Sequence, residues 1–160
     1  QHDALPICLA AGAHGVEIDL NRTRDGVGVL AHDEVINDQQ GSLMHLHQLD
    51  YAAAKTRQPA LTTLDEVLAL VRDRQSLLNV DIKDLGVVAH AMDRLRAFDC
   101  LDLAYLTGIE LTDAGQVIAD HPDARVYVNL RVQGRASLFD ARLSKRAEKE
   151  IGRASWWETV

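Results

Sequence analysis

Aromatic residues, prolines and cysteines are scarce in this sequence of 160 residues. Its 2 cysteines cannot form a multi-bridge framework, so the cysteine count gives no sign of a disulfide-stapled fold. Its 3 prolines are scattered and no segment is of low complexity, which disfavours disordered, collagen-like and repeat architectures. No apolar run approaches the roughly 20 residues of a membrane-spanning helix, so stable membrane insertion is not expected.

Positive charge is also in the minority. The sequence has 17 Lys and Arg residues against 24 Asp and Glu residues, and its formal net charge is -7. This balance disfavours nucleic acid as a partner, and an anionic substrate would need local positive charge such as a metal ion. The hydrophobic fraction of 47% and the charged fraction of 26% are typical of an ordinary globular domain.

Both ends of the chain resemble translated adaptor DNA. One codon set for residues 2–7 has a reverse complement that, in a shifted frame, encodes the end of Glu150, residues 151–155 and the start of Trp156. The same DNA resembles a common short-read sequencing adaptor. We therefore expect residues 1–8 and 150–160 to be artefact and residues 9–149 to be a partial domain. The alternative, that these are ordinary termini, stays open.

Apolar periodicity divides the rest of the chain into alternating strands and helices. Thr63 and Glu66 fit a capping box at the start of a helix, and Asp25-Gly26 is a turn signal. Residues 37–58 are predicted to form a long polar loop. The alternation indicates βαβ units and a parallel sheet, an α/β fold. The predicted strands cover residues 16–20, 27–31, 77–82, part of 103–111, and 125–130, and the predicted helices cover 63–74, 88–95, and 112 to just before Pro122.

Three groups of polar residues stand at predicted strand ends, where parallel β/α folds place their active sites. Glu17 and Asp19 are two apart on one strand and share a face, an oxygen-rich arrangement that suits Mg²⁺ or Ca²⁺. His32 ends the next apolar run, where an imidazole can act as general acid or base. Asp81 and Lys83 close a third strand, which places a carboxylate beside an ammonium that can contact an anion.

Each group taken alone is more often structural than functional. A Glu-x-Asp strand usually faces solvent, a His-Asp pair at a strand end usually forms a turn, and an Asp-x-Lys pair is usually a solvated ion pair worth under about 1 kcal/mol. The order of the three groups along one β/α pattern favours function. The other histidines are assigned to the surface or to packing, and they are His14, His45, His47, His90 and His121. Among them, His45 and His47 are the strongest candidates for a functional role.

Five motifs also occur in a specific order. They are Gly12–Leu20 (GAHGVEIDL), Thr23–Gly26 (TRDG), Val29–Asp33 (VLAHD), Pro59–Leu68 (PALTTLDEVL) and Asn79–Lys83 (NVDIK). This ordered set resembles the glycerophosphodiester phosphodiesterases, over roughly residues 9–130.

The resemblance implies a partial TIM (β/α) barrel of the phospholipase C-like phosphodiesterase type. The first and last strands would be missing, because a closed barrel typically takes about 250 residues. The implied activity is hydrolysis of small-molecule glycerophosphodiesters to glycerol 3-phosphate and an alcohol, in lipid and glycerol metabolism, with a divalent cation (Mg²⁺ or Ca²⁺) and two histidines. The head-group alcohol, the oligomeric state and the compartment (cytoplasmic, or secreted or periplasmic) stay open.

Carried over by position, the resemblance makes Glu17 and Asp19 metal ligands and His32 one of the two acid/base histidines. Asp81 stands where the family usually has a glutamate ligand, which is one methylene longer. Lys83 matches the companion lysine and is assigned to substrate binding. The His-Arg pair of the family's first strand, which supplies the other histidine, has no match, so we expect this fragment to be inactive alone.

Two other functions stay open. A phospholipase C-like or sphingomyelinase-like lyase would stop at the cyclic product. A catalytically silent β/α binding module would hold a structural cation or none. The first strand of the full gene separates these possibilities, because the absence of a His-Arg pair there would favour the silent module.

Overall fold

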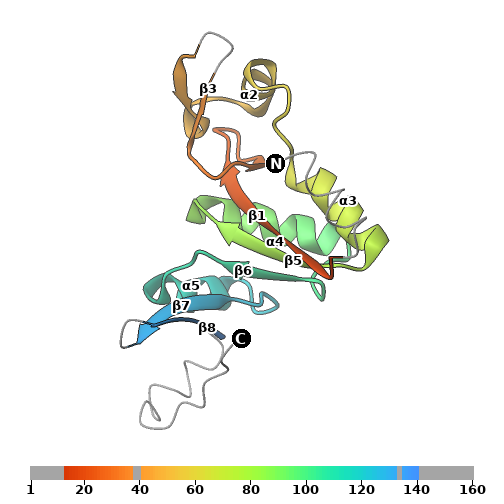
Figure 1. Cartoon of the computed structure of the whole chain (residues 1–160), viewed down its shortest axis with the longest axis vertical. Coiled ribbons are helices and arrows are strands. Elements are labelled where there is room, and N and C mark those ends of the chain that lie inside the picture. The colour runs from red at the N-terminus through yellow and green to blue at the C-terminus, as the bar shows by residue number, and fades with distance from the viewer. Residues whose placement is uncertain (1–12, 38–40, 133–134, 141–160) are drawn as a thin grey trace.

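A four-stranded sheet lies at the centre of the chain, which a computed structural model describes over residues 13–37, 41–132 and 135–140. Three neighbouring strands run parallel. The remaining strand lies at one edge of the sheet and forms an antiparallel hairpin with the strand beside it (Figure 1). The predicted α/β fold with a parallel sheet is confirmed. Within the described ranges the sheet does not close, as expected of a partial barrel. The strands in spatial order are β2 (Gly28–Leu30), β1 (Gly15–Arg22), β5 (Leu77–Ile82) and β6 (Ala104–Thr107).

Helices follow the parallel strands, as the apolar spacing predicts. At the helix that begins at Leu64, the Thr63 hydroxyl accepts a hydrogen bond from the N–H of Glu66, whose carboxylate accepts from the N–H of Thr63. This is the predicted capping box. No helix in the described part of the chain has the length and hydropathy that a bilayer crossing requires. The helices are α3 (Leu64–Arg74), α4 (Val88–Ala97), which follows the short turn η2 (Leu85–Val87), and α5 (Leu111–Asp120).

One face of the sheet packs on these helices. Alternate residues of a strand point to opposite faces, and Leu20, Leu78 and Val80 belong to one buried cluster with Leu68 of α3 and Met92 of α4. Burial of each such side chain contributes about 1.5–3 kcal/mol. The residues between them on β1 and β5 therefore face away from the helices.

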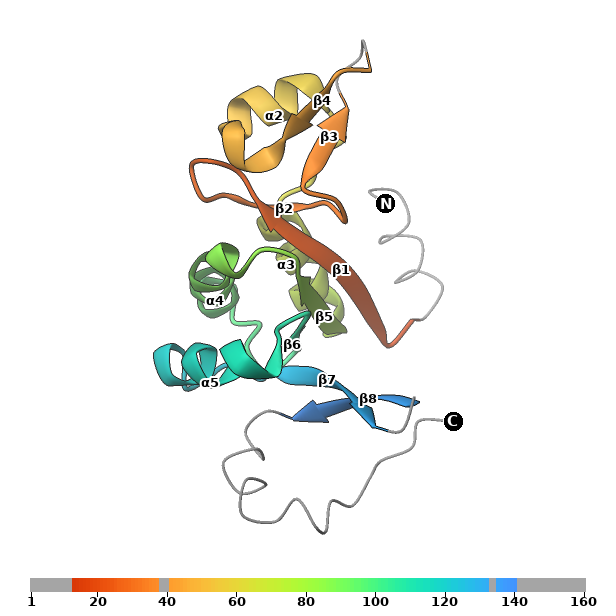
Figure 2. The same ribbon diagram turned by 90° about the vertical axis from the view of Figure 1, so that its left-hand side faces the viewer.

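The prediction of a long polar loop over residues 37–58 is wrong. Two strands and two short helices form a small lobe at one end of the molecule, the hairpin lobe (Figures 1 and 2). Its widely spaced apolar residues show no regular period, and they become a core only by packing with Val29 and Leu61 from outside the segment. The elements of the lobe are β3 (Val35–Asn37), β4 (Leu43–His45), η1 (Leu46–Gln48) and α2 (Tyr51–Arg57).

The last predicted strand, over residues 125–130, is confirmed as β7 (Tyr127–Val132). The residues just before β7 contact β6 of the sheet, where the N–H of Leu106 donates to the carbonyl of Arg125 at 2.8 Å. Leu106 and Val126 then form a parallel bridge. β7 pairs antiparallel with β8 (Arg135–Asp140), at the end opposite the hairpin lobe (Figure 2).

Candidate active site

The sheet face that points away from the helices carries polar side chains. Parallel pairing sets Glu17 of β1 beside Asn79 of β5, and Asp19 beside Asp81. Asp81 pairs in turn with Thr107 of β6. Because paired residues on neighbouring strands project to the same face, side chains far apart in sequence converge here.

Glu17, Asp19 and Asp81 form a carboxylate cluster in which one oxygen of each lies within 4.8 Å of the others. Lys83 bridges two of them, with Nζ 2.9 Å from Asp19 Oδ1 and 2.6 Å from Asp81 Oδ2. The hydrogen bond to Asp81 raises the pKa of Lys83 against the opposing effect of partial burial, and the bond to Asp19 raises it further. The ammonium thereby offsets the repulsion between two carboxylates on adjacent strands.

The donor set of the carboxylate cluster fits a hard divalent cation. Carboxylate oxygens are the ligands that Mg²⁺ and Ca²⁺ prefer, whereas imidazole and thiolate suit softer metals. Glu17 is exposed and Asp19 and Asp81 are partly buried, so the cluster is reachable from solvent. A divalent cation is the group that these residues suit.

Two residues at the end of β6 position Asp81, and neither belongs to the motifs that predict the site. Thr107 is 5% exposed, and its hydroxyl lies 2.8 Å from Asn79 Oδ1 and 3.1 Å from Asp81 Oδ1. Gly108 follows with a φ of 75°, and a Cβ added there would collide with Asp81 Oδ1. A Thr-Gly pair after a strand is an ordinary turn signal, so only the fold connects it to Asp81.

His32 lies near the carboxylate cluster but is not bonded to it. The N–H of Ala31 donates to the carbonyl of Asp19 at 3.1 Å, so His32 follows the point where the hairpin meets β1. Its side chain is 68% exposed, and Nδ1 lies 2.9 Å from Asp33 Oδ1. In the ranges that the structure describes, no hydrogen bond or ion pair joins His32 to the carboxylates.

A hollow of about 570 Å³ links His32 to Lys83, both of which line it. Glu17, Asp19 and Asp81 are not among the lining residues, so the hollow opens beside the carboxylate cluster with Lys83 at the boundary. A ligand in it would meet an imidazole and an ammonium. The other lining residues come from β1 and from the start of the hairpin lobe: Asn21, Asp33, Glu34, Val35, Asn37 and Leu43.

The structure thus brings together Glu17, Asp19, Asp81 and Lys83, and it places His32 on the adjoining hollow. The predicted convergence at one edge of the sheet rests on β1 and β5, which run parallel. His32 is placed by another element, because it follows β2, which pairs antiparallel with β1. The individual roles of these residues stay predictions.

Solved structures share this fold. A glycerophosphodiester phosphodiesterase from Thermotoga maritima matches with a TM-score of 0.68 and 20% identity, over 94% of this chain and 63% of that one. One from Agrobacterium tumefaciens matches with a TM-score of 0.66 and 17% identity, over 78% and 58%. A phosphodiesterase from Oleispira antarctica, in complex with the product sn-glycerol-3-phosphate, matches with a TM-score of 0.69 and 17% identity, over 92% and 64%.

This chain spans less than two thirds of the length of each of these proteins. At such identities the likeness establishes the fold alone, and no curated protein matches the sequence. The model of the "Glycerophosphoryl diester phosphodiesterase family" matches residues 5–150. With nearly the whole sequence matched, the chain belongs to the glycerophosphoryl diester phosphodiesterase family, as its ordered motifs predict.

Proposed function

We propose that this chain carries part of the active site of an enzyme that hydrolyses glycerophosphodiesters to glycerol 3-phosphate and an alcohol. The observation that carries the proposal is the meeting of three carboxylates with Lys83, beside the hollow that His32 lines. Family membership supports the same chemistry. Because the chain spans less than two thirds of its structural relatives, we propose the activity for the complete gene product.

Charge explains why these residue types suit a phosphodiester, whose own negative charge repels a nucleophile. Glu17, Asp19 and Asp81 would hold a divalent cation, Mg²⁺ or Ca²⁺, which supplies positive charge against the phosphate oxygens. Lys83 would add a second positive group. An ammonium has three N–H donors, and two of those of Lys83 point to Asp19 and Asp81, which leaves the third for a phosphate oxygen.

His32 would perform one of the two proton transfers that the reaction needs. When its Nδ1 carries the hydrogen and donates it to Asp33, Nε2 is free to take a proton from the attacking oxygen or to return one to the departing alkoxide. In the cyclic-phosphate route of the family, the first attacking oxygen is the glycerol hydroxyl of the substrate. The Asp33 carboxylate would stabilise the imidazolium formed in this step.

The first test replaces the imidazole. In the complete gene product, His32→Ala is expected to lower turnover of glycerophosphocholine by about 10²–10⁴-fold, the usual contribution of an acid/base group. Its affinity for Mg²⁺ and Ca²⁺ should not change, because His32 is not a ligand. Release of glycerol 3-phosphate and a calorimetric metal titration measure the two effects. His121→Ala, beyond α5 and away from the hollow, is the control, and near-normal turnover in His32→Ala would overturn the assignment.

The second test removes one ligand charge at constant side-chain size. Asp19→Asn should raise the cation concentration for half-maximal activity at least about tenfold, as losses in metal shells typically do. The measurement is activity across a chelator and metal titration, with circular dichroism to check folding. Asp93→Asn on α4 is the matched control. An unchanged metal dependence argues against the carboxylate cluster as the cation site.

The products of the same assay separate the alternative functions. Accumulation of a cyclic glycerol phosphate would identify a lyase that lacks the second, hydrolytic step. Metal binding without turnover in the complete gene product would identify a silent binding module. Release of glycerol 3-phosphate is the result that the proposal requires.

A further inference from the structure

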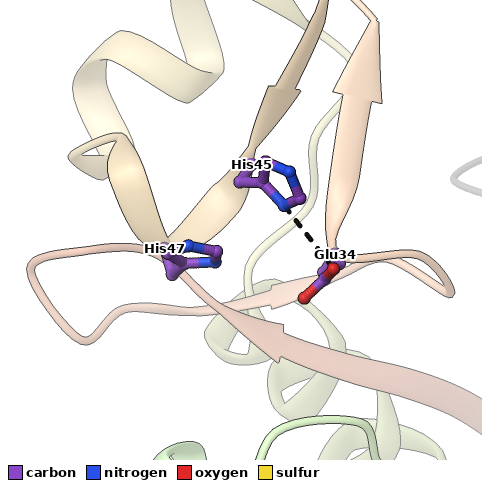
Figure 3. A group of neighbouring side chains, drawn as sticks. All are labelled: Glu34, His45 and His47. Carbon is purple, nitrogen blue, oxygen red and sulfur yellow. Dashed lines mark ion pairs between the residues drawn. The ribbon is translucent and has the colours of Figure 1, made fainter.

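Three side chains of the hairpin-lobe region converge apart from the carboxylate cluster (Figure 3). Glu34 directly precedes β3, His45 ends β4, and His47 lies in η1. One possible ligand atom of each lies within 4.8 Å of the others. We propose that these three residues form a second cation site, which binds a transition metal of the Zn²⁺ type.

Backbone pairing in the lobe produces this convergence. Val35 pairs with His45 across β3 and β4, and the N–H of Leu46 donates to the carbonyl of Glu34 at 2.7 Å. Leu46 is 1% exposed and anchors the segment in the core of the lobe. Leu46 separates His45 from His47 in the sequence, and the two rings lie close to Glu34 (Figure 3).

One nitrogen of His45 has no hydrogen-bond partner in the described part of the chain. Although its side chain is 43% exposed, its Nδ1 atom is shielded from solvent and has no hydrogen-bond partner among the described residues. Glu34 Oε1 lies 3.5 Å from this atom, a separation at which the two form an ion pair when the imidazole is protonated. An unsatisfied buried polar atom costs free energy. A cation between Nδ1 and the carboxylate would satisfy both groups.

The geometry is close to what a tetrahedral ion needs. Ligand atoms about 2.1 Å from a tetrahedral ion are separated by roughly 3.4 Å, and the Glu34 and His45 atoms are already 3.5 Å apart. The ring centroids of His45 and His47 are 5.1 Å apart, and one ligand atom of the exposed His47 lies within 4.8 Å of those of Glu34 and His45, so it would have to move closer to complete a tetrahedral set. Three protein ligands would leave the fourth position to water.

The donor atoms select a different metal from the one that suits the carboxylate cluster. Two imidazoles with one carboxylate favour Zn²⁺ and neighbouring transition metals, whereas an all-carboxylate set favours Mg²⁺ or Ca²⁺. The proposal therefore does not depend on the proposed catalytic function. The two sites share no ligand, although Glu34 and His47 border a smaller hollow of about 300 Å³ together with Lys83.

A cation at this site would connect the two ends of the β3–β4 hairpin. Glu34 lies just before β3, His45 ends β4, and His47 lies just after it. The ion would therefore cross-link the two ends of the segment that lines the larger hollow. Binding to the folded chain alone stabilises the fold by mass action. We therefore expect Zn²⁺ to raise the melting temperature of the chain.

The test titrates the full chain with Zn²⁺ in excess Mg²⁺, which is added to compete for the carboxylate cluster. His45→Ala and His47→Ala should each weaken Zn²⁺ affinity at least about tenfold and remove the Zn²⁺-dependent rise in melting temperature. Asp19→Asn and the control His14→Ala should leave both unchanged. Co²⁺ provides a second readout, because its visible absorption intensifies in a tetrahedral site.

Two results would overturn the proposal. One is Zn²⁺ affinity that is the same in His45→Ala, His47→Ala and the unsubstituted chain. The other is Zn²⁺ binding that Asp19→Asn abolishes, which would assign the ion to the carboxylate cluster. His45→Gln, which keeps a polar side chain of similar length, separates loss of the ligand from loss of packing, and circular dichroism checks that each variant folds.

Discussion

Asp81 reaches the carboxylate cluster because the residue after β6 has no side chain. Gly108 has a φ of 75°, in the left-handed region that favours glycine. A Cβ there would overlap Asp81 Oδ1 and lie 2.5 Å from the carbonyl oxygen of Ile82. Thr107 is within hydrogen-bonding distance of the same carboxylate. These two residues are therefore positioning residues for Asp81, contributed by the neighbouring strand.

Gly108→Ala tests this positioning role. The methyl group must displace Asp81, and the backbone is strained, so we expect weaker Mg²⁺ or Ca²⁺ binding and a free energy of unfolding lower by about 1–3 kcal/mol. A calorimetric metal titration and urea unfolding measure the two changes. Gly115→Ala in α5, where no atom beyond its chain neighbours and the helix's own backbone lies within 4 Å of the added Cβ, should leave metal affinity unchanged. Metal affinity equal to that of the unsubstituted chain would show that Gly108 does not position Asp81.

At the scale of the element, α3 owes its first turn to reciprocal hydrogen bonds. The first N–H groups of a helix have no partner within it, and here the Thr63 hydroxyl and the Glu66 carboxylate supply partners. Thr63 also forms a β-bridge with Val29, next to the point where the N–H of Leu30 donates to the carbonyl of Thr62. The start of α3 is thereby held against β2, the strand that leads to His32.

Thr63→Ala should lower the free energy of unfolding by about 1 kcal/mol, because the capping hydroxyl is lost. Urea unfolding measures the change. Thr56→Ala in α2 is a matched control, since that hydroxyl donates to the carbonyl of Ala52 within the helix and caps no free N–H. We expect its effect to stay within about 0.5 kcal/mol. Equal losses in the two variants would mean that the capping box does not stabilise α3.

At the scale of the whole molecule, the sheet and the hairpin lobe have separate hydrophobic cores. Polar contacts at the β1–β2 turn join them. The N–H of Arg24 donates to the carbonyl of Leu49, and its guanidinium makes two hydrogen bonds to Asp50, which lower the pKa of that carboxyl. The N–H of Tyr51 donates to Asp25 Oδ1 at 3.0 Å. The lobe therefore docks beside the candidate site through these polar contacts and through Val29 of β2, which packs in the core of the lobe.

Because the lobe and the sheet have separate cores, we expect a cavity-forming substitution in one core to destabilise mainly the elements around that core. Ile36→Ala should cost about 2–5 kcal/mol and should lower the hydrogen-exchange protection of β3, β4 and α2 more than that of β5. Val80→Ala, in the core of the sheet, is the converse variant and should lower the protection of β5 and α3. Exchange measured by mass spectrometry resolves these segments. Equal loss of protection in the lobe and in β5 after Ile36→Ala would indicate a single cooperative unit.

Local patterns predicted most of the sheet and its helices. The predicted strand over residues 77–82 coincides with β5, and the capping box places the start of α3 correctly. Both signals are local, because strand alternation and helix caps involve residues close in sequence. The hairpin lobe gave no such signal, since Ile36, Leu46 and Leu49 form a core only with partners brought in by folding.

The sequence by itself determined the family, the strand and helix pattern of the sheet, and the shared face of Glu17 and Asp19, because motif order and two-residue spacing are properties of the chain. Only the tertiary structure decided which of these residues meet. The parallel register sets Asp19 against Asp81, and β6 brings Gly108 to the same carboxylate. Likewise, the β3–β4 pairing brings Glu34 to His45. Strand register and lobe packing depend on contacts between distant segments, which spacing along one strand cannot specify.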